Sequence, residues 1–296
     1  MNIIKYYKIF FAISIVLVIA SVVSLAMYGL NLGIDFRGGT LIEMRFADAI
    51  DAKSLSADLT AAGFGNVSTQ PASDNRVIIK MQSIESQQQR EKIVQLISEK
   101  YGKFEEQKFD TFGPTIGKEL QSKAIWQTGL VMLGILLYIA YAFRKVSQAK
   151  SGQKVSSWKM SWAAIIALLH DLLIVLGVFA ILGKFLRVEI DSLFITALLT
   201  VLGFSVHDTI VVFDRVRENL QRGTGMSFID TLNYSVNQTL TRSINTSMTV
   251  LLVLLALALF GGASTFYFIL ALLVGITVGT YSSIYIASTL LLVWHK

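Results

Sequence analysis

The chain has 296 residues, of which 53% are hydrophobic and 16% are charged, and its mean hydropathy is +0.59. A soluble globular domain is about a quarter charged, so this composition excludes an ordinary soluble protein. The net charge of +6 comes from basic residues placed between apolar segments, a pattern that predicts membrane topology and no nucleic-acid partner. Cysteine is absent, which excludes disulfides and thiolate metal sites.

Six long apolar runs follow one another along the chain. They are Ile9–Tyr28, Ile125–Phe143, Met160–Leu182, Ile190–Phe213, Ile244–Phe260 and Phe266–Trp294. Each is near or above the roughly 17–25 residues that a helix needs to cross a bilayer, so we expect an α-helical polytopic membrane protein with six transmembrane helices. The first run could instead be a signal peptide cleaved near Ala26. Its length, and the misplaced C-terminus that cleavage would leave, favour a retained helix.

Basic residues concentrate in some of the connections between these runs. Lys5 and Lys8 precede the first run, and the others are Arg144, Lys145, Lys150, Lys154, Lys159, Arg215, Arg217 and Arg222. Residues 29–122, in contrast, contain 11 basic and 13 acidic residues. The positive-inside rule therefore predicts that both termini and the loops 144–159 and 214–241 are cytoplasmic, and that residues 29–122 form a periplasmic domain. Residues 1–28 then contain the first helix, and residues 123–296 contain the other five.

The predicted periplasmic segment contains two helical and four strand patterns. In chain order they are Thr40–Phe46, Asp51–Gly63, Val67–Gln70, Arg76–Met81, Ser86–Tyr101 and Phe104–Phe112. Alternating apolar residues indicate the strands, and apolar residues at helical spacing indicate the two helices. The order strand, helix, strand, strand, helix, strand predicts an α+β domain of the ferredoxin-like type.

A glycine-rich motif, residues 33–40, precedes the first predicted strand. It lacks the Gly-Lys-Ser/Thr sequence and the following helix of a phosphate-binding loop, so we expect no nucleotide, no other cofactor and no enzymatic activity. A tight entry into the strand is the favoured role of Gly38 and Gly39, over a ligand site. The three histidines do not have the spacing of a metal site.

The fourth run contains Asp208, and an ionisable side chain inside a membrane helix is costly and usually functional. Ser205 lies three residues before Asp208 and therefore on the same helix face. A second polar face is expected at the start of the fifth run, formed by Arg242, Asn245, Thr246 and Thr249. Because polar faces turn inward in membrane bundles, we predict that Arg242 pairs with Asp208.

This pair suggests proton coupling. Asp208 stays ionised while it contacts Arg242, takes up a proton from outside when the pair separates, and releases it inward when the pair re-forms. A static pair that only fixes the helix register is the alternative interpretation.

Other intramembrane polar residues give weaker signals. His207 lies about 100° around the helix from Asp208, so a packing role is favoured over a proton relay. Asp171 is the better candidate than His170 for a polar interior. In the sixth run, small residues recur at every fourth position, which predicts close helix packing. These residues are Ala271, Gly275, Gly279, Ser283 and Ala287.

Four motifs together resemble the SecF branch of the SecD/SecF family, within the resistance-nodulation-division superfamily. They are residues 33–40, 112–117, 203–219 and 240–247. The signature positions are Gly33, Asp35, Arg37, Gly38, Gly39, Asp214 and Arg215. The resemblance covers essentially the whole chain. It maps the proton-coupling residues of the family onto Asp208 and Arg242, and it differs at His207, where the family more often has Asn.

This resemblance implies an accessory subunit of the Sec protein translocase in the bacterial cytoplasmic membrane. Such a subunit works with SecD and uses the proton-motive force to promote export, and its further partners are the SecYEG channel, YajC and the unfolded preprotein. Two alternatives remain open. One is a half-transporter that exports lipid or small molecules, and the other is a purely structural scaffold in which Asp208 is inert.

Overall fold

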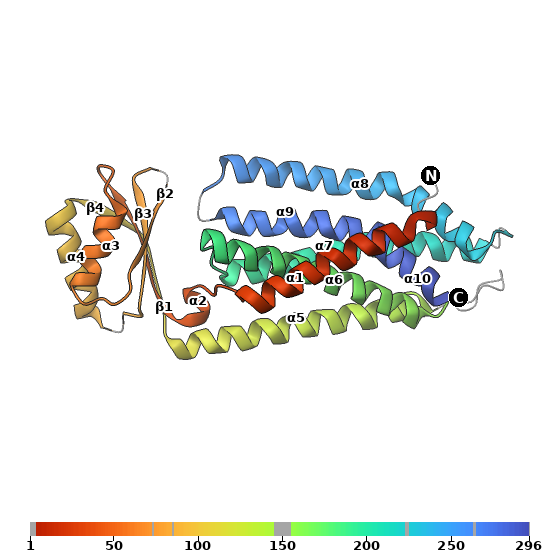
Figure 1. Cartoon of the computed structure of the whole chain (residues 1–296), viewed down its shortest axis with the longest axis horizontal. Helices are drawn as coiled ribbons and strands as arrows, with labels where there is room; N and C mark the ends of the chain where they lie inside the picture. The colour runs from red at the N-terminus through yellow and green to blue at the C-terminus, as the bar shows by residue number, and fades with distance from the viewer. Residues whose placement is uncertain are drawn as a thin grey trace.

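The structure is a computed structural model and describes residues 4–72, 74–84, 86–144, 155–222, 225–262 and 265–295. A long helical bundle has a small α+β domain at one end (Figure 1). The start of the first helix and the end of the last one lie at the opposite end of the bundle. The predicted fold class, six membrane-spanning helices with one inserted α+β domain, is confirmed.

Six helical segments are long and apolar enough to cross a membrane. The first is α1 (Tyr7–Tyr28), preceded by a short turn, η1 (Ile4–Tyr6). The next four are α5 (Pro114–Ala142), α6 (Ser157–Leu186), α7 (Ser192–Arg222) and α8 (Phe228–Phe260). The last consists of α9 (Phe266–Tyr281), a π-helical turn, η4 (Ser282–Ala287), and α10 (Ser288–His295).

Some boundaries differ from those expected from the sequence. The end of the domain was expected at residue 122, but α5 already begins at Pro114, where proline is favoured because it lacks one of the backbone N–H groups that the first helical turn leaves unpaired. Most of the expected loop 214–241 is helical, because α7 continues to Arg222 and α8 starts at Phe228. Residues 145–154 and 223–224 of the expected loops lie outside the described residues.

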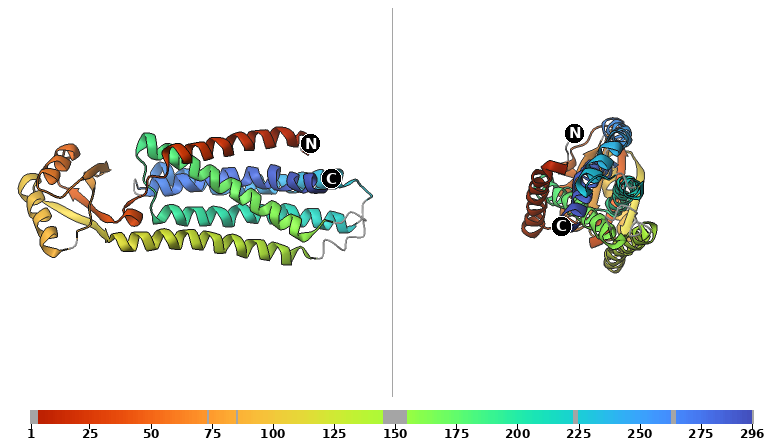
Figure 2. Two further views of the ribbon diagram at one scale, coloured as in Figure 1. Left: turned by 60° about the horizontal axis from the view of Figure 1, so that its bottom comes forward. Right: turned by 90° about the vertical axis from the view of Figure 1, so that its right-hand side faces the viewer.

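The spans of α6, α7 and α9 are more buried within the bundle than those of α1, α5 and α8. Figure 2 shows α1, α5 and α8 at the periphery when the bundle is viewed end-on. The outer helices expose large apolar side chains such as Ile19, Leu130 and Leu252. Exposed apolar side chains on helices with internally satisfied backbones are what a lipid environment requires. The fold therefore presents a lipid-compatible outer surface around a packed centre.

Small residues allow the central helices to approach closely. All five positions of the predicted small-residue stripe in the last span are buried, which confirms that prediction. A Cβ atom on Gly275 would lie 2.3 Å from a methyl carbon of Val201, and one on Gly279 would lie 2.9 Å from the Cβ of Ser205. The stripe therefore packs α9 and η4 against α7 within the bundle.

Gly177 has the same role between α6 and α1, because a Cβ atom there would lie 2.3 Å from the Cβ of Ser21. We expect Gly177→Ala to displace α1 and to lower the free energy of unfolding by about 1–3 kcal/mol. Gly134→Ala is the matched control, since the space around Gly134 is open and alanine favours the helix. Unfolding of the purified chain by dodecyl sulfate in micelles measures both variants. Equal stability of the two would contradict the packing role.

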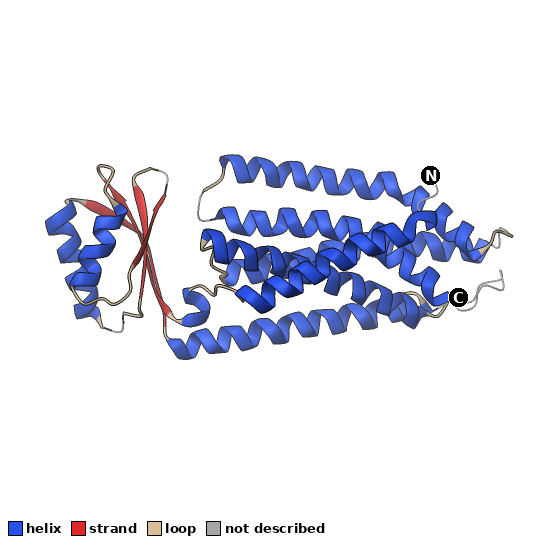
Figure 3. Cartoon of the chain, viewed as in Figure 1, coloured by secondary structure: helices blue, strands red, loops and turns tan. Residues whose placement is uncertain are grey.

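The inserted domain follows the predicted strand and helix order. Its elements are β1 (Gly39–Phe46), α3 (Ala52–Ala61), β2 (Ser68–Ala72), β3 (Arg76–Met81), α4 (Gln87–Tyr101) and β4 (Phe104–Phe112). The sheet order is β2-β3-β1-β4, and all neighbouring strands are antiparallel. Ile42, Met44 and Phe46 of β1 form part of the core beneath α3 and α4. Both helices lie on the sheet face that points away from the bundle (Figure 3).

Asp58 links α3 to α4, because its carboxylate accepts hydrogen bonds from Lys100 and Tyr101, each at 2.8 Å. These two bonds, led by that from Lys100, hold the pKa of Asp58 below its ordinary value. Burial, followed by the hydrogen bond to Asp58, raises the pKa of Tyr101 to about 12. A carboxyl with a lowered pKa stabilises the fold above its unfolded pKa, and this stabilisation is lost as the pH falls through the folded value.

We therefore expect Asp58→Asn to be less heat-stable than the unmodified chain at neutral pH. The difference should disappear as the pH falls below the ordinary range of a carboxyl group. Thermal unfolding of the full chain at a series of pH values tests this, with Asp48→Asn, an exposed carboxyl of the same domain, as the control. A stability difference that is independent of pH would count against the link.

Candidate intramembrane functional site

The glycine-rich motif connects the domain to the start of α7. The amide of Gly33 donates to the carbonyl of Ile190 at 2.7 Å, and Asp35 accepts a hydrogen bond from the amide of Ser192 at 2.9 Å. Asp191 accepts from the amide of Phe194 at 2.9 Å, and burial raises the pKa of Asp191. Two carboxyl groups thus lie at the amino end of α7, where the helix dipole favours negative charge.

Gly38 and Gly39 are required by close backbone contacts, as the expected strand entry implies. Gly38 has a φ of +82°, and a Cβ atom there would lie 2.9 Å from the backbone nitrogen of Pro114. A Cβ atom on Gly39 would lie 2.8 Å from the carbonyl oxygen of Met81. The two glycines therefore let the short helix α2 (Ile34–Arg37) turn directly into β1 beside the start of α5.

Arg37 is exposed and lines a polar hollow of about 370 Å³ between the domain and the bundle. An ion pair of 2.7 Å between Lys80 of β3 and Glu189 also joins the two parts. The signature positions of the glycine-rich motif thus have a structural role, because they connect the domain to the start of the helix that contains Asp208.

Asp208 lies on the buried face of α7 with only 3% of its surface exposed. The hydroxyls of Ser243 and Ser247 approach its carboxyl group from α8. Nevertheless, the Oδ2 atom of Asp208 and the Oγ atom of Ser243 are buried without a hydrogen-bond partner among the described residues. A buried carboxylate oxygen without a donor is expensive, and protonation removes its charge. This atom is therefore suited to take up a proton.

The predicted pairing of Arg242 with Asp208 is wrong for this chain alone. Arg242 is exposed, and within the described part of the chain no ion pair joins the two. The inward face of α8 is instead a stripe of small hydroxyl residues at every fourth position, namely Ser235, Thr239, Ser243 and Ser247. Arg242 is one residue, or about 100°, away from this face. Small hydroxyls pack closely against a neighbouring helix, whereas an arginine would hold it apart.

The polar face of α8 that was predicted to point into the bundle is therefore mostly exposed. Arg242, Asn245 and Thr249 are exposed, and Thr246 is half-buried. His207 of α7 is also exposed and points away from the face of Asp208, as its spacing indicates. Lipid offers no hydrogen-bond partner to such exposed groups.

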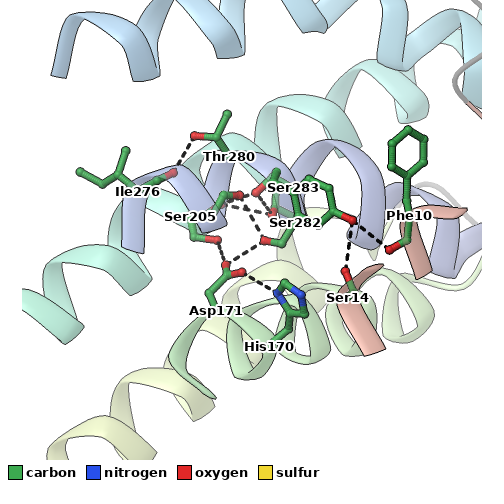
Figure 4. Close-up of polar contacts among 12 residues, drawn as sticks. Phe10, Ser14, His170, Asp171, Ser205, Ile276, Thr280, Ser282 and Ser283 are labelled. Atoms are coloured by element: carbon green, nitrogen blue, oxygen red, sulfur yellow. Dashed lines mark hydrogen bonds and ion pairs between the residues drawn. The ribbon is translucent and has the colours of Figure 1, made fainter. Parts of the chain in front are cut away.

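Asp171 of α6 is fully buried at the centre of the bundle. Its Oδ2 atom accepts hydrogen bonds from Ser205 at 2.6 Å and from Ser282 at 2.8 Å, and its Oδ1 atom lies 3.0 Å from Nδ1 of His170 (Figure 4). Ser205 was grouped with Asp208 from the sequence, but its hydroxyl binds Asp171. Sequence reasoning missed Ser243, Ser247 and Ser282, although the four-residue spacing of hydroxyls on α8 is visible in the sequence.

Asp214 and Arg215 belong to a charged surface at the end of α7. Asp214 pairs with Arg217 at 2.6 Å, and Arg215 pairs with Glu218 at 2.7 Å. Exposed pairs of this kind contribute about 0–1 kcal/mol each. These signature positions therefore lie apart from the buried carboxyls.

Comparison with known proteins finds matches along the whole chain. The family profile described as protein export membrane protein SecD/SecF, C-terminal, matches residues 92–296, and the SecD/SecF GG motif matches residues 23–50. SecF of Thermobaculum terrenum is 44% identical over 100% of this chain and 94% of its own. SecDF of Bacillus subtilis is 34% identical over 97% of this chain but only 37% of its own.

Solved structures give the same result. A crystal structure of SecDF, a translocon-associated membrane protein from a Thermus species, has a TM-score of 0.83 and 34% identity. The match covers 99% of this chain and 38% of that one. SecDF in a super-membrane-facing form has a TM-score of 0.69 with the same coverage.

Proposed function

The chain belongs to the SecD/SecF protein-export family, and we propose that it is an accessory subunit of the Sec protein translocase that promotes polypeptide export with the proton-motive force. It would act in the bacterial cytoplasmic membrane, with both termini in the cytoplasm and the α+β domain in the periplasm. The basic residues at the ends of the spans support this orientation. We propose no catalytic role and no cofactor for the chain.

The single observation that most supports proton coupling is the buried, unpartnered Oδ2 atom of Asp208. A carboxylate in this position is unstable until it receives a proton or a counter-charge. Moving one charge through the membrane potential supplies about 2.3 kcal/mol per 100 mV, which is enough to change the protonation state of such a group. A cycle of proton uptake from the periplasm and release to the cytoplasm would thus do work on the bundle.

SecD is the proposed partner of the exposed polar face of α7 and α8. The relatives named SecDF are much longer chains, of which this one matches 37–38%. A partner that covers this face would place an acidic side chain against Arg242, so that the arginine is neutralised in the membrane. The SecYEG channel, YajC and the unfolded preprotein are the further proposed contacts.

The α7 contacts of the glycine-rich motif suggest how proton binding would reach the domain. Asp35 and Gly33 link the start of the domain to α7 and the loop before it, and Asp208 lies on the same helix. A shift of α7 on protonation would therefore move the base of the domain. The domain would hold or release the emerging polypeptide as it moves.

The test is export of a signal-bearing preprotein into vesicles that contain the channel, SecD and this chain. We expect a proton gradient to accelerate export only when the chain and SecD are both present. Acceleration without the chain would refute the proposal. Gradient-dependent release of lipid or a small apolar dye, without any effect on preprotein, would favour the half-transporter instead.

A further inference from the structure

A second buried carboxyl group has the construction of a proton-binding site, and it is separate from Asp208. Asp171 is fully buried, and His170 is the only side chain that forms an ion-pair contact with it among the described residues. No lysine or arginine neutralises it in this part of the structure. A buried charge without a cation is unfavourable in the membrane interior unless hydrogen bonds compensate or a proton neutralises it.

The hydroxyl of Ser282 has two acceptors, which makes both protonation states possible. It lies 2.8 Å from Oδ2 of Asp171 and 3.1 Å from the carbonyl oxygen of Gly279. A hydroxyl group has only one hydrogen to donate. When Asp171 is ionised, that hydrogen points to the carboxylate. When Asp171 is protonated, the carboxyl donates to the Ser282 oxygen, and the Ser282 hydrogen turns to Gly279.

His170 directs the added proton to the carboxyl group. Its Nδ1 atom lies 3.0 Å from Asp171, whereas its Nε2 atom is buried without a hydrogen-bond partner in the described structure. A protonated imidazole would bury an Nε2–H group with no acceptor. The neutral ring, donating from Nδ1, avoids this cost, so the proton belongs on Oδ2 of Asp171.

The site is connected to an irregular turn of the last span. Ser282 is the first residue of the π-helical turn η4, and the next residue, Ser283, donates to the carbonyl oxygen of Ser205 at 3.0 Å. Single π-helical turns inside α-helices are frequent at functional sites. The hydroxyl of Ser282 therefore joins α6 to this turn, and protonation of Asp171 reverses the direction of that hydrogen bond.

The titratable groups around the site come from three neighbouring elements. His170 is on the same helix, Asp208 lies one turn beyond Ser205 on α7, and the ring of Tyr281 on α9 stacks on His170 at 6.3 Å. Tyr285 of η4 contacts Tyr281 in turn, with the ring centres 5.3 Å apart. Helix α1 contributes the hydroxyl of Ser14, which contacts Tyr281 at 3.3 Å.

We propose that Asp171 is a second intramembrane proton-binding site, whose protonation reverses the hydrogen bond that joins α6 to the π-helical turn at Ser282–Ala287. This claim concerns proton binding by the carboxyl group and does not depend on the export role. Asp208 would bind one proton next to the exposed face of α7 and α8, and Asp171 would bind another at the centre of the bundle.

Infrared difference spectroscopy of the full chain, assembled with SecD in lipid nanodiscs, tests this. An Asp208→Asn background removes the signal of that carboxyl. We expect a carbonyl band of a protonated, dry carboxyl that disappears as the pH rises and that is absent when Asp171→Asn is added. A spectrum with no such band, or an unchanged band in the double variant, would overturn the proposal.

A second variant keeps the test decisive if Asp171→Asn fails to fold. Ser282→Ala removes one donor from the ionised carboxylate, so the band should persist to higher pH, by about one to two pH units. Thr277→Ala is the matched control, because the Thr277 hydroxyl bonds only within its own helix, to Leu273 at 2.8 Å. If the band of Ser282→Ala titrates at the same pH as that of Thr277→Ala, the proposed hydrogen bond between Ser282 and the ionised Asp171 is refuted.

Discussion

Asp208→Asn should reduce gradient-driven export to the rate measured without a gradient, while the translocase still assembles. Asparagine has nearly the same shape as aspartate and fits the same buried position beside Ser243 and Ser247. It is permanently neutral, however, and cannot exchange a proton. Because the change mimics the protonated carboxyl, the chain should be as stable as before or more stable, since a buried charge is removed.

The control is Asp230→Asn, the same chemical change at an exposed position near the start of α8. Co-purification of each variant with SecD establishes assembly before export is measured. We expect Asp230→Asn to keep its response to the gradient. If Asp208→Asn also keeps the full response while assembled, Asp208 has a structural role only, as in the scaffold alternative.

Arg242→Gln should give the second large effect, which is a loss of stable association with SecD together with a loss of the gradient response. The proposed contact places an acidic side chain of SecD against the exposed Arg242, and glutamine would leave that side chain buried without a counter-charge. Breaking a buried pair in this way costs about 3–5 kcal/mol, which corresponds to a weakening of association by more than a hundredfold.

Arg222→Gln is the matched control for this change. Arg222 lies at the exposed end of α7 and pairs with Glu218 at 2.5 Å, so its loss should cost little. Association is measured by co-purification and by the concentration of SecD that restores export. Equal association of Arg242→Gln and the unmodified chain would place Arg242 against lipid headgroups rather than against SecD.

The overall architecture could be predicted from local patterns. The spans follow from hydropathy, and the domain follows from alternation in strands such as Arg76–Met81, which the structure reproduces residue for residue. Burial of the small-residue stripe also followed from spacing, because only glycine, alanine and serine permit backbones to approach this closely. These properties depend on residues near one another in the sequence.

The pairing of charges could not be predicted in the same way. Opposite charge suggested that Arg242 meets Asp208, but the orientation of α8 is set by the stripe that includes Ser243 and Ser247, which packs toward α7. The π-helical turn at Ser282–Ala287 could not be predicted from the sequence either, since the turn contains no proline or glycine. Both features depend on contacts between helices that are far apart in the sequence.

Measurement of proton flux tests directly whether Asp208 couples the proton gradient to export. Vesicles that contain the channel, SecD and this chain, loaded with a pH-sensitive dye, are given a proton gradient in the presence of preprotein. We expect proton entry that accompanies export in the unmodified complex and that is absent in assembled Asp208→Asn. The same proton entry in both complexes would contradict the claim that Asp208 couples the gradient to export.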